Sequence, residues 1–317
     1  SNILLLTPAT LDQIREIIEY RLIPNVVSRR FAEGLSQAAQ KMNKIALCQV
    51  EIDTGMGRTG FLYNEVVGEI IAILRLPNLK VTGVFSHFPA ADSSDEQDVE
   101  YTYTQINRFH EVIQTLKHLG IKIPLYHMAN SAGVLNYPIY GNAIRPGIIT
   151  YGLYPSNWKQ KDIQVKPILS FRSKVIQLRK LPKNFSVSYG RTYQTRKPTH
   201  LAVIRAGYGD GLRRGLSNKG RVILEGEYCP IVGRVCMDMS MVLIPQDLSV
   251  SLDSVATIIG EDGDKEIIAD EHAKILDTIN YEIITGLSER VPKLYFLNGS
   301  IVGQYDINGT KYTAALS

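Results

Sequence analysis

Cysteine is scarce in this sequence, with only Cys48, Cys229 and Cys236 among 317 residues. Three thiols cannot all pair, and they lack the clustered spacing of a zinc site, so we expect neither a disulfide framework nor a metal centre. Free thiols suit a reducing compartment, and we expect a cytoplasmic protein. No apolar run approaches the roughly 20 residues of a membrane span and no secretory signal is visible, so we expect no association with membranes.

An excess of charge is also absent. The sequence has 35 Lys and Arg against 31 Asp and Glu, a net charge of +4, and no dense basic run. We therefore expect no nucleic-acid partner, and basic groups directed at small anions instead. Hydrophobic residues make up 44% and charged residues 21%, which is ordinary for a soluble globular protein. The length suits two domains.

The first half alternates short apolar runs with amphipathic segments, a pattern typical of a parallel sheet or barrel. Helices are predicted over residues 28–42, 65–76 and 95–119, among others. About six strands are predicted before residue 150, at residues 3–6, 23–27, 45–51, 81–86, 123–127 and 143–144.

The second half is predicted to be mostly β. Strands are expected over residues 175–178, 201–204, 221–224, 230–233 and 255–259, with a helix over 269–278 and closing strands over 295–306. The stretch between Pro155 and Pro167 is polar and resembles a linker. We expect one domain over residues 1–160 and a second over 161–317.

A glycine-rich motif over residues 51–61 follows the buried strand at 45–50, so it lies at that strand's C-terminal end. Its glycines Gly55, Gly57 and Gly60 permit turns closed to other residues and a close approach to a ligand. The planar guanidinium of Arg58 suits a carboxylate. The motif predicts binding of a small acid; the alternative is an ordinary turn with a solvated arginine.

Polar groups also follow the other strands of this half, and the ends of barrel strands are where reactive groups gather. His87 follows one strand, Asn130 and Ser131 the next, and Arg145 with Gly147 and Ile148 the last. A hydroxyl, free amides and a cation together predict a pocket for a phosphorylated cofactor. Singly, His87 is more often a packed histidine, and Asn130 with Ser131 a plain helix cap.

Tyrosines beside glycines form a second cluster, in residues 186–193, 207–211 and 233–238. A tyrosine such as Tyr189 can act as a base if nearby cations make its hydroxyl more acidic. His87 or Arg145 could do so across a domain or subunit interface. The alternative is that these are β-turn residues.

Together these motifs resemble alanine racemase, in order and over nearly the whole chain. The resemblance is carried by Asp53 to Gly60, His87-Phe88 with Asp92, Asn130-Ser131-Ala132, Arg145 to Ile148 with Tyr151-Gly152, Val187 to Gly190, Gly207-Tyr208, Val232 to Arg234 with Cys236-Met237-Asp238, and Ile279 to Glu282.

The resemblance implies a pyridoxal 5'-phosphate enzyme that interconverts L- and D-alanine for cell-wall peptidoglycan synthesis. It also implies a head-to-tail homodimer whose active sites each draw on both subunits. Its barrel has eight strands and residue 1 aligns inside it. We therefore expect a partial (β/α)8 TIM-type barrel without the first strands, followed by a mostly β C-terminal domain.

The family's residue roles carry over by position. Tyr189 would be the base, tuned by His87 and Arg145, with Arg145 facing the pyridine nitrogen. The carboxylate of alanine would be held by Arg58 and the backbone of Met237. The remaining roles are cofactor binding for Asn130, Ser131, Gly147, Ile148 and Tyr281, and the entrance for Asp92, Tyr208, Arg214 and Arg234.

Two departures stand out. Glu51 replaces a lysine, often carbamylated, whose negative group faces the substrate-binding arginine, so Glu51 would supply a carboxylate directly. The Schiff-base lysine, in a Lys-Ala-Asn-Ala-Tyr-Gly motif, has no counterpart among the 317 residues. We expect these residues alone to lack racemase activity. The alternative is a non-catalytic cofactor-binding or structural homologue; a basic-amino-acid decarboxylase fits the motifs less well.

Overall fold

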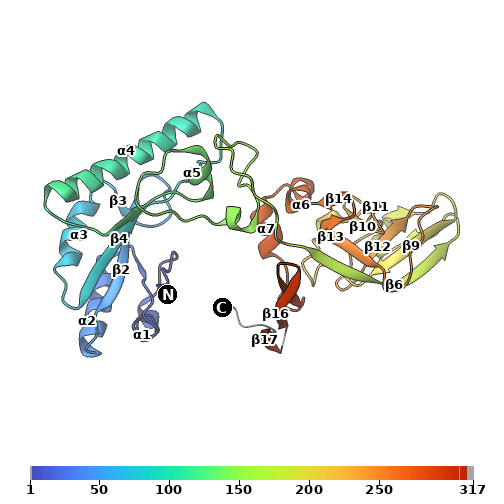
Figure 1. Cartoon of the computed structure of the whole chain (residues 1–317), viewed down its shortest axis with the longest axis horizontal. Helices are drawn as coiled ribbons and strands as arrows, with labels where there is room; N and C mark the ends of the chain where they lie inside the picture. Colours follow the sequence, from blue (N-terminus) through green and yellow to red (C-terminus); the bar gives the residue numbers. More distant parts are fainter. Residues whose placement is uncertain (1, 307, 313–317) are drawn as a thin grey trace. The chain divides into compact units, whose positions relative to one another are not determined.

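The computed structural model describes residues 2–306 and 308–312 (Figure 1). The chain divides into two compact units, residues 1–166 and 167–317. The change from one to the other falls between Lys166 and Pro167, a few residues after the boundary expected at residue 160. Each unit is described by itself.

Unit 1 is built on a parallel sheet with strand order β1-β2-β4-β5, in which β3 pairs with the end of β2. The strands are β1 (Asn25–Val26), β2 (Ala46–Asp53), β3 (Phe61–Leu62), β4 (Leu79–Phe85) and β5 (Leu125–His127). Strand β2 is buried along most of its length, as the apolar run at 45–50 predicts for a central parallel strand.

Helices alternate with these strands. They are α1 (Ile14–Glu19), α2 (Arg29–Lys41), α3 (Val66–Leu74), α4 (Glu96–His118) and α5 (Ser131–Asn136), with 3₁₀ turns η1 (Leu11–Gln13) and η2 (Ile148–Tyr151). Ser28 caps α2 by accepting from the amide of Phe31, and Asp95 caps α4 by accepting from that of Gln97. Helix α4 buries a stripe at helical spacing that includes Ile106, Phe109 and Val112.

Two predicted strands of unit 1 are wrong. Residues 3–6 form only one isolated bridge, between Leu4 and Ile23. Residues 143–144 form no strand, because Asn142 takes the place of a regular ladder: its side-chain oxygen accepts from the amide of Tyr126 at 2.9 Å. The short strand β3 was not expected.

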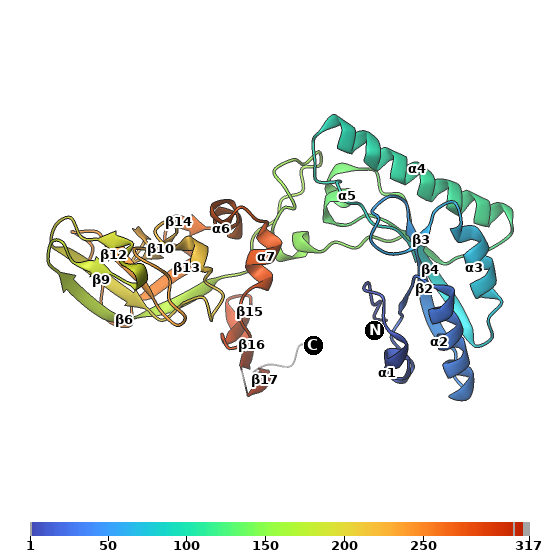
Figure 2. The same ribbon diagram turned by 180° about the vertical axis from the view of Figure 1, so that it is seen from behind.

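Unit 2 carries an antiparallel sheet with order β11-β10-β13-β6-β9-β12, and β14 pairs with β13 (Figure 2). An isolated bridge between Ile231 and Val242 joins its two edge regions, so the sheet curls. Its strands are β6 (Phe171–Leu181), β9 (Thr199–Ile204), β10 (Arg221–Leu224), β11 (Glu227–Pro230), β12 (Ser240–Ile244), β13 (Val255–Asp262) and β14 (Lys265–Ile267). The mostly β character predicted for this half is confirmed.

Smaller elements complete unit 2. Two short strands, β7 (Ser186–Val187) and β8 (Tyr193–Gln194), flank the 3₁₀ turn η3 (Tyr189–Arg191), and η4 (Arg214–Leu216) precedes β10. Then come α6 (Ala269–Leu276), α7 (Asn280–Thr285) and the three-stranded sheet of β15 (Lys293–Leu297), β16 (Ser300–Asp306) and β17 (Gly309–Tyr312). Within the described ranges no helix is both long and apolar enough to cross a membrane.

Candidate active site

Arg145 lies at the centre of a polar cluster of unit 1, at the ends of β4 and β5. This strand-end cluster comprises His87, His127, Asn130, Ser131, Arg145 and Gly147. Its guanidinium donates to the carbonyl oxygens of Ser86 at 2.5 Å and of His127 and Met128 at 3.2 Å. It also donates to Nδ1 of His127 and lies 3.4 Å from Nδ1 of His87. Three backbone acceptors and two imidazoles thus hold one side chain in place.

Both histidines beside Arg145 are neutral at pH 7. Burial, then the charge of Arg145, lowers the pKa of His127 to about 4; burial, Arg145 and Arg58 lower the pKa of His87 to about 4. Because Nδ1 of His127 accepts from Arg145, its proton is assigned to Nε2, which donates to Oε1 of Gln49 at 2.9 Å. Gln49 and His127 therefore orient Arg145 without adding charge.

Arg145 itself remains a cation. Burial lowers its pKa to about 10, with the nearby charge of Glu51 acting in the opposite direction, so it stays protonated at pH 7. Its Nε lies buried without a hydrogen-bond partner among the described residues. A buried donor left unpaired is costly, so this N–H suits an acceptor on a ligand.

Ser131 and Gly147 form a second feature of this cluster. The hydroxyl of Ser131 accepts from the amide of Gly147 at 2.9 Å and from that of Ile149 at 3.4 Å. The prediction of a free amide at Gly147 is therefore wrong, because this amide is bonded within the chain. Asn130 caps α5 by accepting from the amide of Gly133 at 2.9 Å, which confirms the alternative prediction that this residue is a helix cap. Ile148 begins η2 and is buried.

The glycine-rich loop that carries Arg58 is anchored to the rest of unit 1. The carboxylate of Asp53 accepts from the amides of Gly55 at 2.8 Å and Gly57 at 3.1 Å. Tyr101 of α4 donates to the carbonyl of Gly55 at 2.7 Å, and a Cβ on Gly55 would lie 2.4 Å from that hydroxyl. Gly55 also has a φ of +142°. The loop therefore requires glycine here and presents Arg58 from a fixed backbone.

Glu51 lies buried beneath this loop. Its Oε2 accepts from the side chains of Asn25 at 2.5 Å and Thr59 at 2.8 Å. The Glu51 carboxylate thus binds Thr59, the neighbour of Arg58, and stabilises the conformation of the glycine-rich loop.

Tyr189 is displayed by a strained turn of unit 2. Ser188 and Gly190, on either side, have φ of 64° and 68°, and the Ser188 hydroxyl donates to the carbonyl of Arg234 at 2.7 Å. The Tyr189 side chain is 71% exposed. Non-glycine residues with positive φ are uncommon, and they cluster at functional sites, where the surrounding structure stabilises a strained backbone.

Two further loops of unit 2 meet close to each other. The amide of Tyr208 donates to the carbonyl of Cys236 at 2.9 Å, and that of Gly209 to the carbonyl of Met237 at 2.8 Å. A Cβ on Gly207 would lie 2.3 Å from both carbonyl oxygens. Only glycine fits at this position, and the side chains of Tyr208 and Met237 remain exposed.

The structure thus groups the predicted residues within each unit. Unit 1 brings together His87, Asn130, Ser131, Arg145 and Gly147, and unit 2 brings Tyr189 beside Arg234 and Tyr208 beside Met237. Among the other predicted residues, Asp92 lies in unit 1, Arg214 begins η4 and Tyr281 lies on α7. In the described part of the chain, no three histidine, cysteine, aspartate or glutamate side chains are placed to hold a metal ion.

Sequence reasoning missed His127 and Gln49. His127 ends β5 as His87 follows β4, and this shared position at neighbouring strand ends could have identified it. Gln49 lies within the apolar run of β2, and nothing in its local sequence distinguishes it.

Comparison with known proteins gives a consistent result. The family model described as "Alanine racemase, N-terminal domain" matches residues 1–155, and "Alanine racemase, C-terminal domain" matches residues 168–295. The chain is 40% identical over 303 residues to alanine racemase 1 of Clostridium acetobutylicum, covering 95% of this chain and 78% of that one.

Solved structures agree. An alanine racemase from Clostridium difficile 630 matches with a TM-score of 0.91 and 33% identity, over 96% of this chain and 79% of that one. An alanine racemase from Bacillus anthracis with bound L-Ala-P matches with a TM-score of 0.88 and 33% identity, over 96% and 78%. The barrel-like α/β unit, the β unit and the two matched domains all lead to one assignment: this chain belongs to the alanine racemase family.

Proposed function

We propose that this chain supplies the residues described above, in defined roles, to the family's reaction, the interconversion of L- and D-alanine. Alanine racemases depend on pyridoxal 5'-phosphate, which when bound supplies an electron sink that makes the Cα proton removable. The observation that carries the proposal is Arg145: a half-buried cation, fixed by five contacts, with one buried N–H left without a partner among the described residues.

The residues of unit 1 fit the cofactor in two respects. The free Nε–H of Arg145 suits the pyridine nitrogen, and because Arg145 keeps its proton at pH 7, it would donate a hydrogen bond to that nitrogen without protonating it. The Ser131 hydroxyl accepts from the Gly147 amide and can donate its own proton, so it suits a phosphate oxygen, and we assign further cofactor contacts to Asn130, Gly147, Ile148 and Tyr281.

Substrate binding is assigned to the anchored loop and to unit 2. Arg58 and the backbone of Met237 hold the alanine carboxylate, and Glu51 supports Arg58 through Thr59. Tyr189 takes the Cα proton onto its phenolate oxygen, an assignment that its exposed side chain and its defined turn support. Asp92, Tyr208, Arg214 and Arg234 line the entrance.

The assembly is also part of the proposal. Tyr189 and Arg145 lie in different units, and we propose a homodimer in which one subunit's unit 2 completes the site of the other's unit 1. The five-stranded sheet of unit 1 would form part of a (β/α)8 barrel, and free thiols suit a cytoplasmic location.

Racemisation in D2O tests the function. The family's lysine motif is not among these 317 residues, so the chain by itself, supplied with cofactor, should leave L-alanine unchanged. Fused to the lysine-bearing segment of a relative, it should form D-alanine with deuterium at Cα, measured by chiral chromatography and mass spectrometry.

The two outcomes separate the alternatives. Failure of the fused protein to turn over, while it still binds cofactor, would favour a non-catalytic homologue. Turnover by the 317 residues alone, above the free-cofactor rate, would mean that another lysine of this chain serves.

A further inference from the structure

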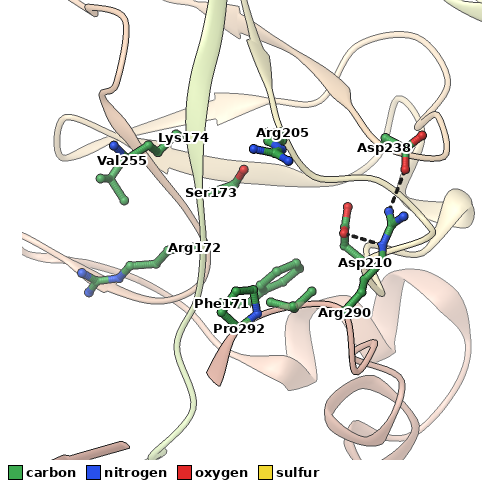
Figure 3. Close-up of a pocket in the computed structure, with 11 residues that line it drawn as sticks. Phe171, Arg172, Ser173, Lys174, Arg205, Asp210, Asp238, Val255, Arg290 and Pro292 are labelled. Carbon is green, nitrogen blue, oxygen red and sulfur yellow. Dashed lines mark hydrogen bonds and ion pairs between the residues drawn. The ribbon is translucent and has the colours of Figure 1, made fainter. Parts of the chain in front are cut away.

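One arginine that no sequence motif singled out, Arg290, joins the two loops of unit 2 to which the proposed function assigns substrate and entrance roles. Figure 3 shows its guanidinium between two carboxylates, with Nε 2.9 Å from Oδ1 of Asp210 and a terminal nitrogen 2.8 Å from Oδ1 of Asp238. The same nitrogen lies 3.4 Å from the carbonyl of Met237. Each arm of the fork thus contacts a different loop.

The loop that contains Asp210 is closed by further contacts. The second oxygen of Asp210 accepts from the amide of Gly207 at 2.9 Å, and its carbonyl accepts from the amide of Ser288 at 3.1 Å. Asp210 therefore ties the loop to itself and to the segment that carries Arg290.

Two glycines line the contact between this loop and the segment that carries Arg290. A Cβ on Gly209 would lie 2.5 Å from a guanidinium nitrogen, and one on Gly211, whose φ is 108°, would lie 2.7 Å from the carbonyl of Gly286. The loop and the segment around Arg290 are in direct contact, with no room for a methyl group between them.

The ion pairs of Arg290 are partly solvated. Its side chain is 41% exposed, and it borders a hollow of about 780 Å³ that Phe171, Arg205 and Pro292 also line (Figure 3). Exposed ion pairs contribute little to global stability. The planar fork can nevertheless fix the geometry of two carboxylates at once, which a point charge cannot.

We propose that Arg290 is a positioning residue of the active site. By binding Asp210 and Asp238 at the same time, it fixes the Met237 backbone and the loop of Tyr208 in the arrangement that binds the amino-acid carboxylate. This inference rests on the proposed function of Met237. It predicts that loss of Arg290 weakens alanine binding and loosens both loops while the fold persists.

Arg221→Ala is the matched control. Arg221 makes a two-armed pair with Glu271 at 2.8 and 2.7 Å and is 39% exposed, yet it contacts neither loop in the described structure. Comparing Arg290→Ala with Arg221→Ala therefore separates the general effect of losing a two-armed surface ion pair from the specific effect of losing the contacts of Arg290 with the two loops.

The test uses the cofactor-loaded full chain. For Arg290→Ala, the dissociation constant of L-alanine, measured by calorimetry, should rise about tenfold, as expected for one lost charge-assisted hydrogen bond. Arg290→Lys should give an intermediate rise. Amide exchange in residues 207–211 and 236–239 should accelerate in Arg290→Ala and stay unchanged in Arg221→Ala. In the fused, active protein KM should rise with little change in kcat.

An alanine affinity for Arg290→Ala equal to that of Arg221→Ala would overturn the positioning role, even if exchange accelerates. Fused wild-type protein that binds alanine without turnover would count against the proposed function only, and the affinities would still decide the role of Arg290. Wild-type protein that binds no alanine would overturn both.

Discussion

The amide of Gly147 donates to the hydroxyl of Ser131 over 2.9 Å, which joins the start of η2 to the start of α5 across 16 residues of sequence. This contact occupies the Gly147 amide and orients the Ser131 hydroxyl, whose own proton can be donated to a ligand. It lies in the same unit as Arg145, the half-buried cation of the strand-end cluster.

The strand-end cluster should make the stability of unit 1 depend on pH. His87 and His127 have pKa values lowered to about 4, whereas an unfolded histidine has a pKa of 6.5. Between these values the unfolded chain binds protons that the folded unit does not, so the free energy of unfolding falls as pH falls from 6.5 toward 4. Each histidine contributes a slope of about 1.4 kcal/mol per pH unit near pH 5.

Urea unfolding at a series of pH values measures this slope. Other groups titrate in the same window, so the informative comparison is with His127→Gln, which should remove about one histidine's share of the slope. An identical slope in the variant would show that His127 is protonated in the folded state.

Gly83→Ala tests the chain of contacts behind Arg145. A Cβ on Gly83 would lie 2.7 Å from the amide carbon of Gln49, the residue that accepts from His127. We expect Gln49 to be displaced and the free energy of unfolding to fall by about 1 to 3 kcal/mol, from overpacking and a lost hydrogen bond.

Gly68→Ala is the control for this variant, because a Cβ there has no neighbour within 4 Å and Gly68 lies inside α3. It should be neutral or stabilising by up to about 1 kcal/mol. Equal effects of the two substitutions on urea unfolding would contradict the packing argument.

Tyr189→Phe tests the proposed base. Since the side chain is 71% exposed, the melting temperature should hardly change, with a stability effect within about 0.5 kcal/mol. In the fused, active protein, racemisation from the side served by Tyr189 should slow by about 10² to 10⁴-fold, as for loss of a positioned general base. A wild-type rate in the variant would exclude Tyr189 as the base.

Mixed dimers test where that base acts. If Tyr189 reaches the partner's site, combining Tyr189→Phe subunits with subunits whose supplied lysine is replaced by alanine leaves one site with both defects and one with neither. Each heterodimer should then regain roughly half of wild-type activity. Inactive but demonstrably mixed dimers would place the base and the lysine in the same subunit's site.

Sequence reasoning worked where the determinants are local. The helix predicted over residues 28–42, the buried run of β2 and the glycine requirement at Gly55 each follow from a few neighbouring residues, and the structure has them. Sequence reasoning failed where the local conformation depends on a residue far away in the sequence. Asn142 replaces a strand by bonding to Tyr126, and no local pattern shows this.

The same division holds in the candidate site. Arg145 could be found from its position after a predicted strand, although that strand does not form. The chain from Arg145 through His127 to Gln49 spans contacts of 18 and 78 residues in sequence, and Arg290 meets Asp210 across 80. Such pairs become visible only once the fold brings them together.

Cofactor affinity tests the central assignment most directly. By equilibrium dialysis the wild-type chain should bind one pyridoxal 5'-phosphate, and Ser131→Ala should bind it about tenfold more weakly, about 1.4 kcal/mol for one hydrogen bond to a charged group. Ser36→Ala, which removes an equally buried hydroxyl bonded to the Pro77 carbonyl, should bind like wild type. Equal affinities of Ser131→Ala and wild type would contradict the placement of the phosphate at Ser131 and Gly147.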